Sequence, residues 1–281
     1  MSFVLEDSLS LPGDPAKANE DAFAHGDQAA VVIDGATPLG EGLMPGPSDA
    51  QWIAQFGARR LMAHLREGEG PRKALRAALA DAQKSFEALR RHEPEEMWQT
   101  PCASMMLAVP GTSGLEFLWY GDCAALMKQG DAAVTVVGET MDKRAAEAQR
   151  AQNIAQEKKL PPASALSRPE FITALRASRN RINSAGNWLF SPDVKAAAHV
   201  SRRSLKVAGG SALLLATDGF LALASDYGAD SADGLMAAAL DKGLAALGAE
   251  LRAIEAQDSS GDRFPRFKKS DDATALLLRI S

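Results

Sequence analysis

Acidic residues recur beside the most hydrophobic segments of this chain. The stretch "NEDAFAHGDQAAVVIDGAT", residues 19–37, carries Glu20, Asp21 and Asp34 next to an apolar run, and Asp218 follows "ALLLAT" far downstream. Asp34 and Asp218 are each followed by glycine. Taken alone, an Asp-Gly pair predicts a turn, because aspartate bonds its own backbone and glycine accepts positive φ. The repetition at the ends of apolar segments favours a shared chemical role.

Metal binding is the shared role that these positions predict. Asp122 ends the apolar run "LEFLWYG", and Asp271 and Asp272 open the final one. If the strands before Asp34 and Asp218 are neighbours, their carboxylates converge on one sheet edge and repel each other unless a cation neutralises them. Oxygen-only clusters suit magnesium, manganese or calcium. Water held between two such ions becomes nucleophilic at neutral pH.

Bulk composition limits the function classes. The chain has 281 residues, 46% hydrophobic and 24% charged, with a formal net charge of −5. The acidic balance argues against a nucleic-acid binder or an anionic-membrane binder. No apolar run is long enough to cross a bilayer and the first residues lack a signal-peptide pattern, so we expect a cytoplasmic protein. Cys102 and Cys123 are predicted to be reduced core thiols.

The elements that must position the acids follow from hydrophobic periodicity. An apolar strand precedes Asp34, a helix begins near Ser48, and a second runs over "GPRKALRAALADAQKSFEALRRH" with its apolar face ending at Leu89. From residue 101, four short apolar runs separated by Gly, Pro or Asp predict consecutive antiparallel strands. A long helix is predicted over about 231–257, and "ATALLLRI" is predicted as the last strand.

Residues 139–186 break this pattern, since they are polar, charged and poor in β-forming residues. Two interpretations stand equally: a solvated helical insertion, or a lid beside the active site. We expect one domain over residues 1–281 that contains this insertion or flap.

Six segments in order resemble the motifs of the metal-dependent PP2C-type protein serine/threonine phosphatases, in a divergent bacterial-type form. They are "NEDAFA", "VVIDGAT", "ASMMLAV", "YGDCAAL", "LLLATDGF" and "SDDATALLLRI". The resemblance implies an α+β fold in which two antiparallel sheets form a sandwich between pairs of helices. It also implies Mg²⁺ or Mn²⁺ as cofactor, with two ions and, as in many bacterial members, a weaker third.

The resemblance assigns roles to particular acids. Asp34 resembles the ligand that bridges two metals, and Gly35 the residue that adds a backbone carbonyl. Asp218 and Asp271 resemble the other ligands of the first metal. The remaining assignments are Glu20 and Asp21 in the second metal's shell, Asp122 with Asp218 at the third site, and Asp272 in positioning its loop.

The implied activity is hydrolysis of phosphoserine and phosphothreonine in proteins by a metal-bridging water. The family's phosphate-gripping arginine is replaced by Ala16, so Lys17 is the candidate substrate-binding residue, with Arg176, Arg179 and Arg181 of the insertion as alternatives. Where many members carry a histidine this chain has Ala36, so no side chain is assigned as the general acid.

Two other functions remain open. One is a pseudophosphatase or regulatory binding module of the same fold, which the retained Asp34, Asp218 and Asp271 disfavour. The other is a phosphatase acting on a small metabolite. A Walker-type nucleotide motif, an Asp-x-Asp nucleophile motif and a Gly-x-Ser-x-Gly elbow are all absent from the sequence.

Overall fold

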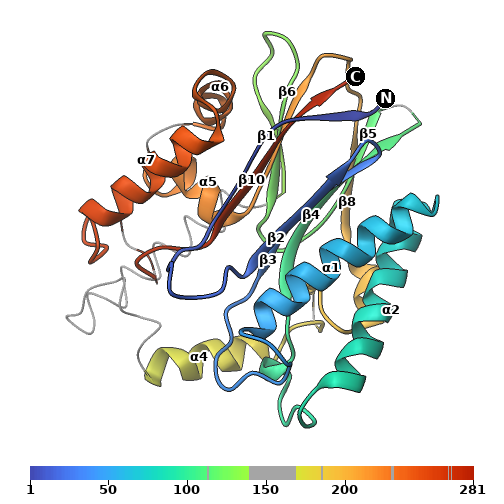
Figure 1. Ribbon diagram of the computed structural model, residues 1–281, viewed down its shortest axis with the longest axis vertical. Helices are drawn as coiled ribbons and strands as arrows, with labels where there is room; N and C mark the ends of the chain where they lie inside the picture. Colours follow the sequence, from blue (N-terminus) through green and yellow to red (C-terminus); the bar gives the residue numbers. More distant parts are fainter. Residues whose placement is uncertain (113, 139–168, 185, 229–230, 265, 267) are drawn as a thin grey trace.

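The protein is an αββα sandwich in this computed structural model, which confirms the predicted fold class (Figure 1). The structure describes residues 1–112, 114–138, 169–184, 186–228, 231–264, 266 and 268–281. The five strands of the first sheet are, in order, β1 (Phe3–Leu11), β10 (Ala273–Ile280), β9 (Ala212–Ala216), β6 (Ala124–Lys128) and β7 (Thr135–Val137). Those of the second are β2 (Asp21–Gly26), β3 (Ala29–Gly35), β4 (Ala103–Gly111), β5 (Gly114–Tyr120) and β8 (Ser201–Leu205).

Helices cover the outer face of each sheet, as Figure 1 shows. The second sheet packs against α1 (Asp49–Arg66) and α2 (Pro71–Leu89), and the first against α5 (Asp218–Ser225), α6 (Ala232–Lys242) and α7 (Leu244–Gln257). The other described helices are α4 (Pro169–Arg179) and the short 3-10 helices η1 (Met97–Gln99) and η3 (Val194–His199). Every helix in the described ranges is too short or too polar to span a bilayer.

The central strands read as unbroken hydrophobic runs because both of their faces are buried. In β3, Val31 and Ile33 pack on the side of α1 and α2, whereas Ala30 and Val32 face the other sheet. In the first sheet, Leu213 and Leu215 of β9 belong to the same inter-sheet core. Successive strand residues point to opposite faces, so a strand between a helix layer and a second sheet needs apolar residues throughout.

Three expectations about the elements are wrong in detail. The helix predicted over 231–257 is broken at Gly243, where φ is +79° and Asp7 accepts the Leu244 backbone N–H. The four strands after residue 101 are not one meander, since β5 and β6 lie in different sheets. Leu89, predicted on the buried face of its helix, is 53% exposed. In contrast, Ser48 caps α1 as predicted, and both cysteines are buried and free.

The predicted insertion over residues 139–186 is only partly within the described chain. Residues 139–168 lie outside the described residues. From residue 169, α4 is anchored to the loop that follows β3. The Arg176 guanidinium donates to the Leu39 carbonyl and lies 4.1 Å from the centre of the Trp98 ring, and Arg179 donates to the Thr37 carbonyl. The described end of the insertion therefore contacts the segment that leaves Asp34.

Candidate metal centre

Three aspartates meet at one end of the sandwich. Asp34 is the penultimate residue of β3, Asp218 opens α5 directly after β9, and Asp122 lies in the link between β5 and β6. One carboxylate oxygen from each lies within 4.8 Å of those from the other two. The convergence was predicted along one sheet edge, which is wrong, because β3 and β9 belong to different sheets. The acids meet across the sandwich instead.

Glycines allow the backbone to approach closely enough for this convergence. A Cβ on Gly35 would lie 2.4 Å from the Ala50 carbonyl oxygen at the start of α1. Gly121 has φ +66°, and a Cβ there would lie 2.1 Å from the Ser104 hydroxyl oxygen. That hydroxyl donates to Asp122 Oδ1 at 2.5 Å. Ser104 is also the residue opposite Asp34 in the β3–β4 pairing, so it links Asp122 to the strand of Asp34.

Asp21 lies beside Asp34 in a buried position. The two residues are paired in the β2–β3 register, and Asp21 is only 5% exposed. Its Oδ2 accepts from the Thr217 hydroxyl at 2.9 Å, whereas its Oδ1 has no hydrogen-bond partner among the described residues. Burial, together with the nearby Asp272 and Asp271, raises the pKa of Asp21 well above its ordinary value. A buried carboxylate oxygen without a donor is suited to a cation.

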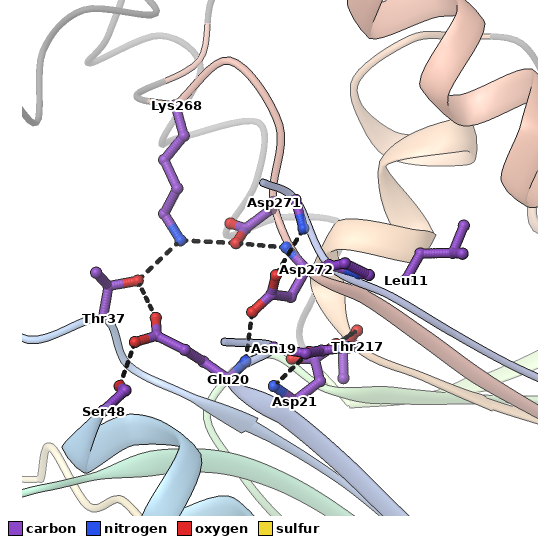
Figure 2. Close-up of polar contacts among 12 residues, drawn as sticks. Leu11, Asn19, Glu20, Asp21, Thr37, Ser48, Thr217, Lys268, Asp271 and Asp272 are labelled. Atoms are coloured by element: carbon purple, nitrogen blue, oxygen red, sulfur yellow. Dashed lines mark hydrogen bonds and ion pairs between the residues drawn. The ribbon is translucent and has the colours of Figure 1, made fainter. Parts of the chain in front are cut away.

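Glu20 is held by two hydroxyl groups (Figure 2). Its Oε2 accepts from the Thr37 hydroxyl at 2.6 Å, and its Oε1 accepts from the Ser48 hydroxyl. Ser48 also caps α1, with its hydroxyl accepting from backbone N–H groups of the first turn. The N-cap of α1 therefore fixes the direction of the Glu20 carboxylate.

Asp271 and Asp272, which precede β10, contact chain segments that lie near the other acids (Figure 2). Asp272 accepts the backbone N–H of Gly13 at 2.7 Å and that of Glu20 at 2.6 Å. Asp271 Oδ1 accepts from the Lys268 ammonium at 2.6 Å. The same ammonium lies 3.3 Å from the Thr37 hydroxyl oxygen. Asp272 thus fastens the chain segment that carries Glu20, and Asp271 faces a cation.

The electrostatics of the cluster favour a bound cation. Burial, then the charges of Asp218, Asp21, Asp271 and Asp122, raise the pKa of Asp34 well above its ordinary value. Burial and nearby carboxylates, that of Asp34 foremost, also raise the pKa of the neighbouring Cys123 thiol, which makes it a poor nucleophile. The donor set consists of oxygens, as hard divalent ions require. The residues present therefore fit a magnesium or manganese centre.

The residues predicted to bind substrate contact groups other than the clustered acids. Lys17 is 79% exposed, and its ammonium lies 4.0 Å from the Asp14 carboxylate. Arg176 and Arg179 donate to backbone carbonyls of the loop after β3, and Arg181 is exposed. The role of Lys17 stays a prediction.

Lys268 is a functional candidate that the sequence did not single out. It belongs to the loop "GDRFPRFKKSDD", where four cationic side chains occur between residues 263 and 269. The sequence alone does not indicate which of these four side chains points toward the acids. Its position three residues before Asp271 was the only available signal, because that spacing places both side chains on one short loop.

Comparison with known proteins gives the sequence a family match. The model for protein phosphatase 2C matches residues 16–252. A solved structure of the Mycobacterium tuberculosis serine/threonine phosphatase PstP/Ppp is 15% identical, with 100% of each chain covered and a TM-score of 0.60. The catalytic domain of PstP in complex with two manganese ions is 16% identical over 99% of each chain, with a TM-score of 0.57.

A third similar structure is the PPM Ser-Thr phosphatase MsPP from Mycobacterium smegmatis, in complex with cacodylate. It is 16% identical, with 100% of this chain and 99% of that chain covered and a TM-score of 0.56. At identities this low, the structural similarity shows that the chains share a fold. No curated protein sequence matches the chain.

Proposed function

The chain belongs to the protein phosphatase 2C family, and from that premise we propose that it hydrolyses phosphoserine and phosphothreonine in proteins. The single observation that carries the proposal is the approach of Asp34, Asp122 and Asp218 oxygens to within 4.8 Å of one another. Such a cluster is costly for a protein that only binds partners, because mutual repulsion destabilises the fold unless a cation compensates it.

The proposed metal-holding residues come from five separate segments. Asp34 would serve both ions, and the Gly35 backbone carbonyl would add a further ligand. Asp218 and Asp271 would complete the ligands of the first ion, and Glu20 and Asp21 would belong to the shell of the second. Asp122 with Asp218 would serve a third, weaker site. Two bound Mg²⁺ or Mn²⁺ ions would supply an activated water and neutralise charge on the phosphoryl group.

The protein's own contribution is to hold these carboxylates in place. Thr217 fixes Asp21 and bonds the Thr274 backbone N–H, so it joins β2 to the first sheet. Ser104 fixes Asp122, and Ser48 with Thr37 fixes Glu20. Ala36 offers no proton, so the leaving alkoxide would take its proton from solvent at the site. Carboxylates held by hydrogen bonds would need less reorganisation during the reaction.

We also propose that residues 1–281 form one domain of this family, that the protein acts in the cytoplasm, and that its partner is a phosphorylated protein. The described part of the insertion, α4, contacts the loop after Asp34 and would border the route of a substrate to the acids.

Hydrolysis assays test the proposal. The purified protein is expected to hydrolyse an aryl phosphate only with Mn²⁺ or Mg²⁺ added, and to prefer phosphoserine or phosphothreonine peptides over small phosphorylated metabolites. Asp34→Asn is expected to lower the rate by at least about a hundredfold, because the proposed bridging ligand loses its charge. Asp131→Asn, at an exposed turn, is the matched control.

Each alternative outcome has a definite meaning. Absence of metal-dependent turnover, with Mn²⁺ still bound, would instead indicate a binding module of this fold. Faster turnover of metabolites than of phosphopeptides would move the substrate class to small molecules.

A further inference from the structure

Lys268 places a positive charge at the edge of the acidic cluster. Its ammonium donates to Asp271 at 2.6 Å and to the Thr37 hydroxyl at 3.3 Å, and its side chain is 34% exposed. Figure 2 shows the side chain directed down toward Asp271 and Thr37, opposite Glu20. The ammonium therefore lies between segments that carry two of the proposed metal-holding acids and is still accessible to solvent.

The loop that carries Lys268 is fastened on both sides. Arg266 is 8% exposed, forms an ion pair with Asp258 at 2.7 Å and donates to the Lys269 carbonyl at 3.0 Å. On the other side, Arg252 donates to the Asp271 carbonyl at 2.8 Å. The loop direction, and with it the base of the Lys268 side chain, is thus set by buried or half-buried guanidinium groups.

The ammonium stays charged in this environment. The ordinary pKa of lysine is about 10.4, so the ammonium is protonated at neutral pH. A cation bound at Asp271 would compensate that carboxylate, and the flexible four-carbon stem would let the ammonium turn to an incoming anion.

We propose that Lys268 binds the phosphoryl oxygens of the substrate. The family resemblance gives this role to an arginine, but this chain has Ala16 at that position. The inference deepens the proposed function and rests on it. Compared with Lys17, which is 79% exposed beside Asp14, Lys268 lies next to the acids where the phosphoryl group would react. A lysine supplies a point charge rather than a bidentate fork, so phosphate binding would be weaker and less directional than with arginine.

Inorganic phosphate, the reaction product, provides a probe that needs no turnover. Isothermal titration of phosphate into the magnesium-loaded protein is expected to show weakening of about tenfold or more in Lys268→Met, which keeps the aliphatic stem and loses the charge. Lys268→Arg is expected to stay within about threefold of the wild type. Lys269→Met is the matched control, since Lys269 is the exposed neighbour.

A separate Mn²⁺ titration excludes a purely structural role. Lys268→Met should bind Mn²⁺ with an affinity within a few fold of the wild type, and its KM for a phosphopeptide should rise more than its kcat falls. Unchanged phosphate affinity in Lys268→Met would overturn the inference. So would a large gain in Mn²⁺ affinity without a phosphate effect, which would make Lys268 a counter-ion of the acids.

Failure of the two proposals can be distinguished. A wild type that binds phosphate through Lys268 but hydrolyses nothing would refute the phosphatase activity and support the anion site. Normal metal-dependent hydrolysis with phosphate binding that ignores Lys268 would refute the anion site alone.

Discussion

At the scale of single residues, Asp34 shows how a carboxylate inside an acidic cluster lowers the stability of its own fold. Burial and the surrounding acids raise its pKa, whereas in the unfolded chain it titrates near its ordinary value of about 3.9. The native state therefore holds its proton to higher pH than the unfolded state. By linkage, the contribution of Asp34 to stability is greatest below about pH 4 and declines as pH rises through the raised pKa.

Asp34→Asn is therefore expected to stabilise the metal-free protein at pH 8 and to have little effect near pH 4. A tenfold difference in proton affinity between the folded and unfolded states corresponds to about 1.4 kcal/mol, so the gain at pH 8 should be on the order of 1 kcal/mol or more. Urea unfolding in the presence of a chelator at the two pH values measures it. An equal difference between variant and wild type at both pH values would contradict the argument, and Asp131→Asn should show none.

At the scale of elements, glycine contacts determine how closely the strand ends and helix starts pack. Gly35 ends β3 against the first turn of α1, and Gly219 brings α5 against the Asp272 carbonyl, where a Cβ would lie at 2.0 Å. In both places the nearest atom is a backbone oxygen, which cannot move aside as a side chain can. The spacing of the acids therefore depends on two residues that have no side chain.

Gly35→Ala is expected to cost about 1–3 kcal/mol of stability and to lower Mn²⁺ affinity, since strand and helix must separate to admit the methyl group. Gly209→Ala is the control, because a Cβ there meets nothing within 4 Å. That variant should stay within about 0.5 kcal/mol of the wild type. Thermal unfolding with and without Mn²⁺ gives both quantities, and a Gly35→Ala protein as stable as the control would refute the packing argument.

The anchoring of α4 is a second property at this scale. Arg176 stacks on Trp98 and donates through two nitrogens to the Leu39 carbonyl, an arrangement that needs the planar guanidinium. Arg176→Lys is expected to speed amide hydrogen exchange in α4 by about two- to fivefold, the equivalent of a lost exposed cation–π contact. Arg181→Lys, exposed near the end of α4, should leave exchange unchanged. Equal exchange rates in the two variants would mean that α4 is held by other contacts.

At the scale of the whole molecule, three of the acids lie where the chain passes from one sheet to the other. Glu20 and Asp21 lie at the passage from β1 to β2, and Asp122 at that from β5 to β6. Asp34 belongs to β3 of the second sheet, and Asp218 opens α5, which follows β9 of the first sheet. Ions held by this set would join the two sheets beyond the apolar core between them.

Binding of Mn²⁺ is therefore expected to raise the unfolding temperature of the whole protein in one transition. At a hundredfold excess over the dissociation constant, the stabilisation is about 2.7 kcal/mol. For a domain of this size that corresponds to roughly 5–10 °C. Calorimetry with increasing Mn²⁺ checks the value. If Asp34→Asn showed the same shift, the ions would be binding elsewhere.

Local residue patterns were enough to predict most of the elements and to single out the acids as candidates. Continuous apolar runs located β3, β4, β9 and β10, because strands buried on both faces need apolar residues throughout, and caps such as Ser48 located helix starts. The same patterns did not indicate the break at Gly243, since leucines continue at helical spacing on both sides.

Which sheet holds each strand, and which side chains meet, became known from the three-dimensional packing. β3 and β9 face each other across the sandwich, so Asp34 and Asp218 approach through packing between sheets rather than through strand pairing. The sequence does not distinguish Lys268 from the cationic residues beside it. The structure does, because the buried Arg266 holds its loop and Asp271 accepts a hydrogen bond from its ammonium. A segment's own residues encode how it folds, whereas distances between distant segments depend on how all of them pack together.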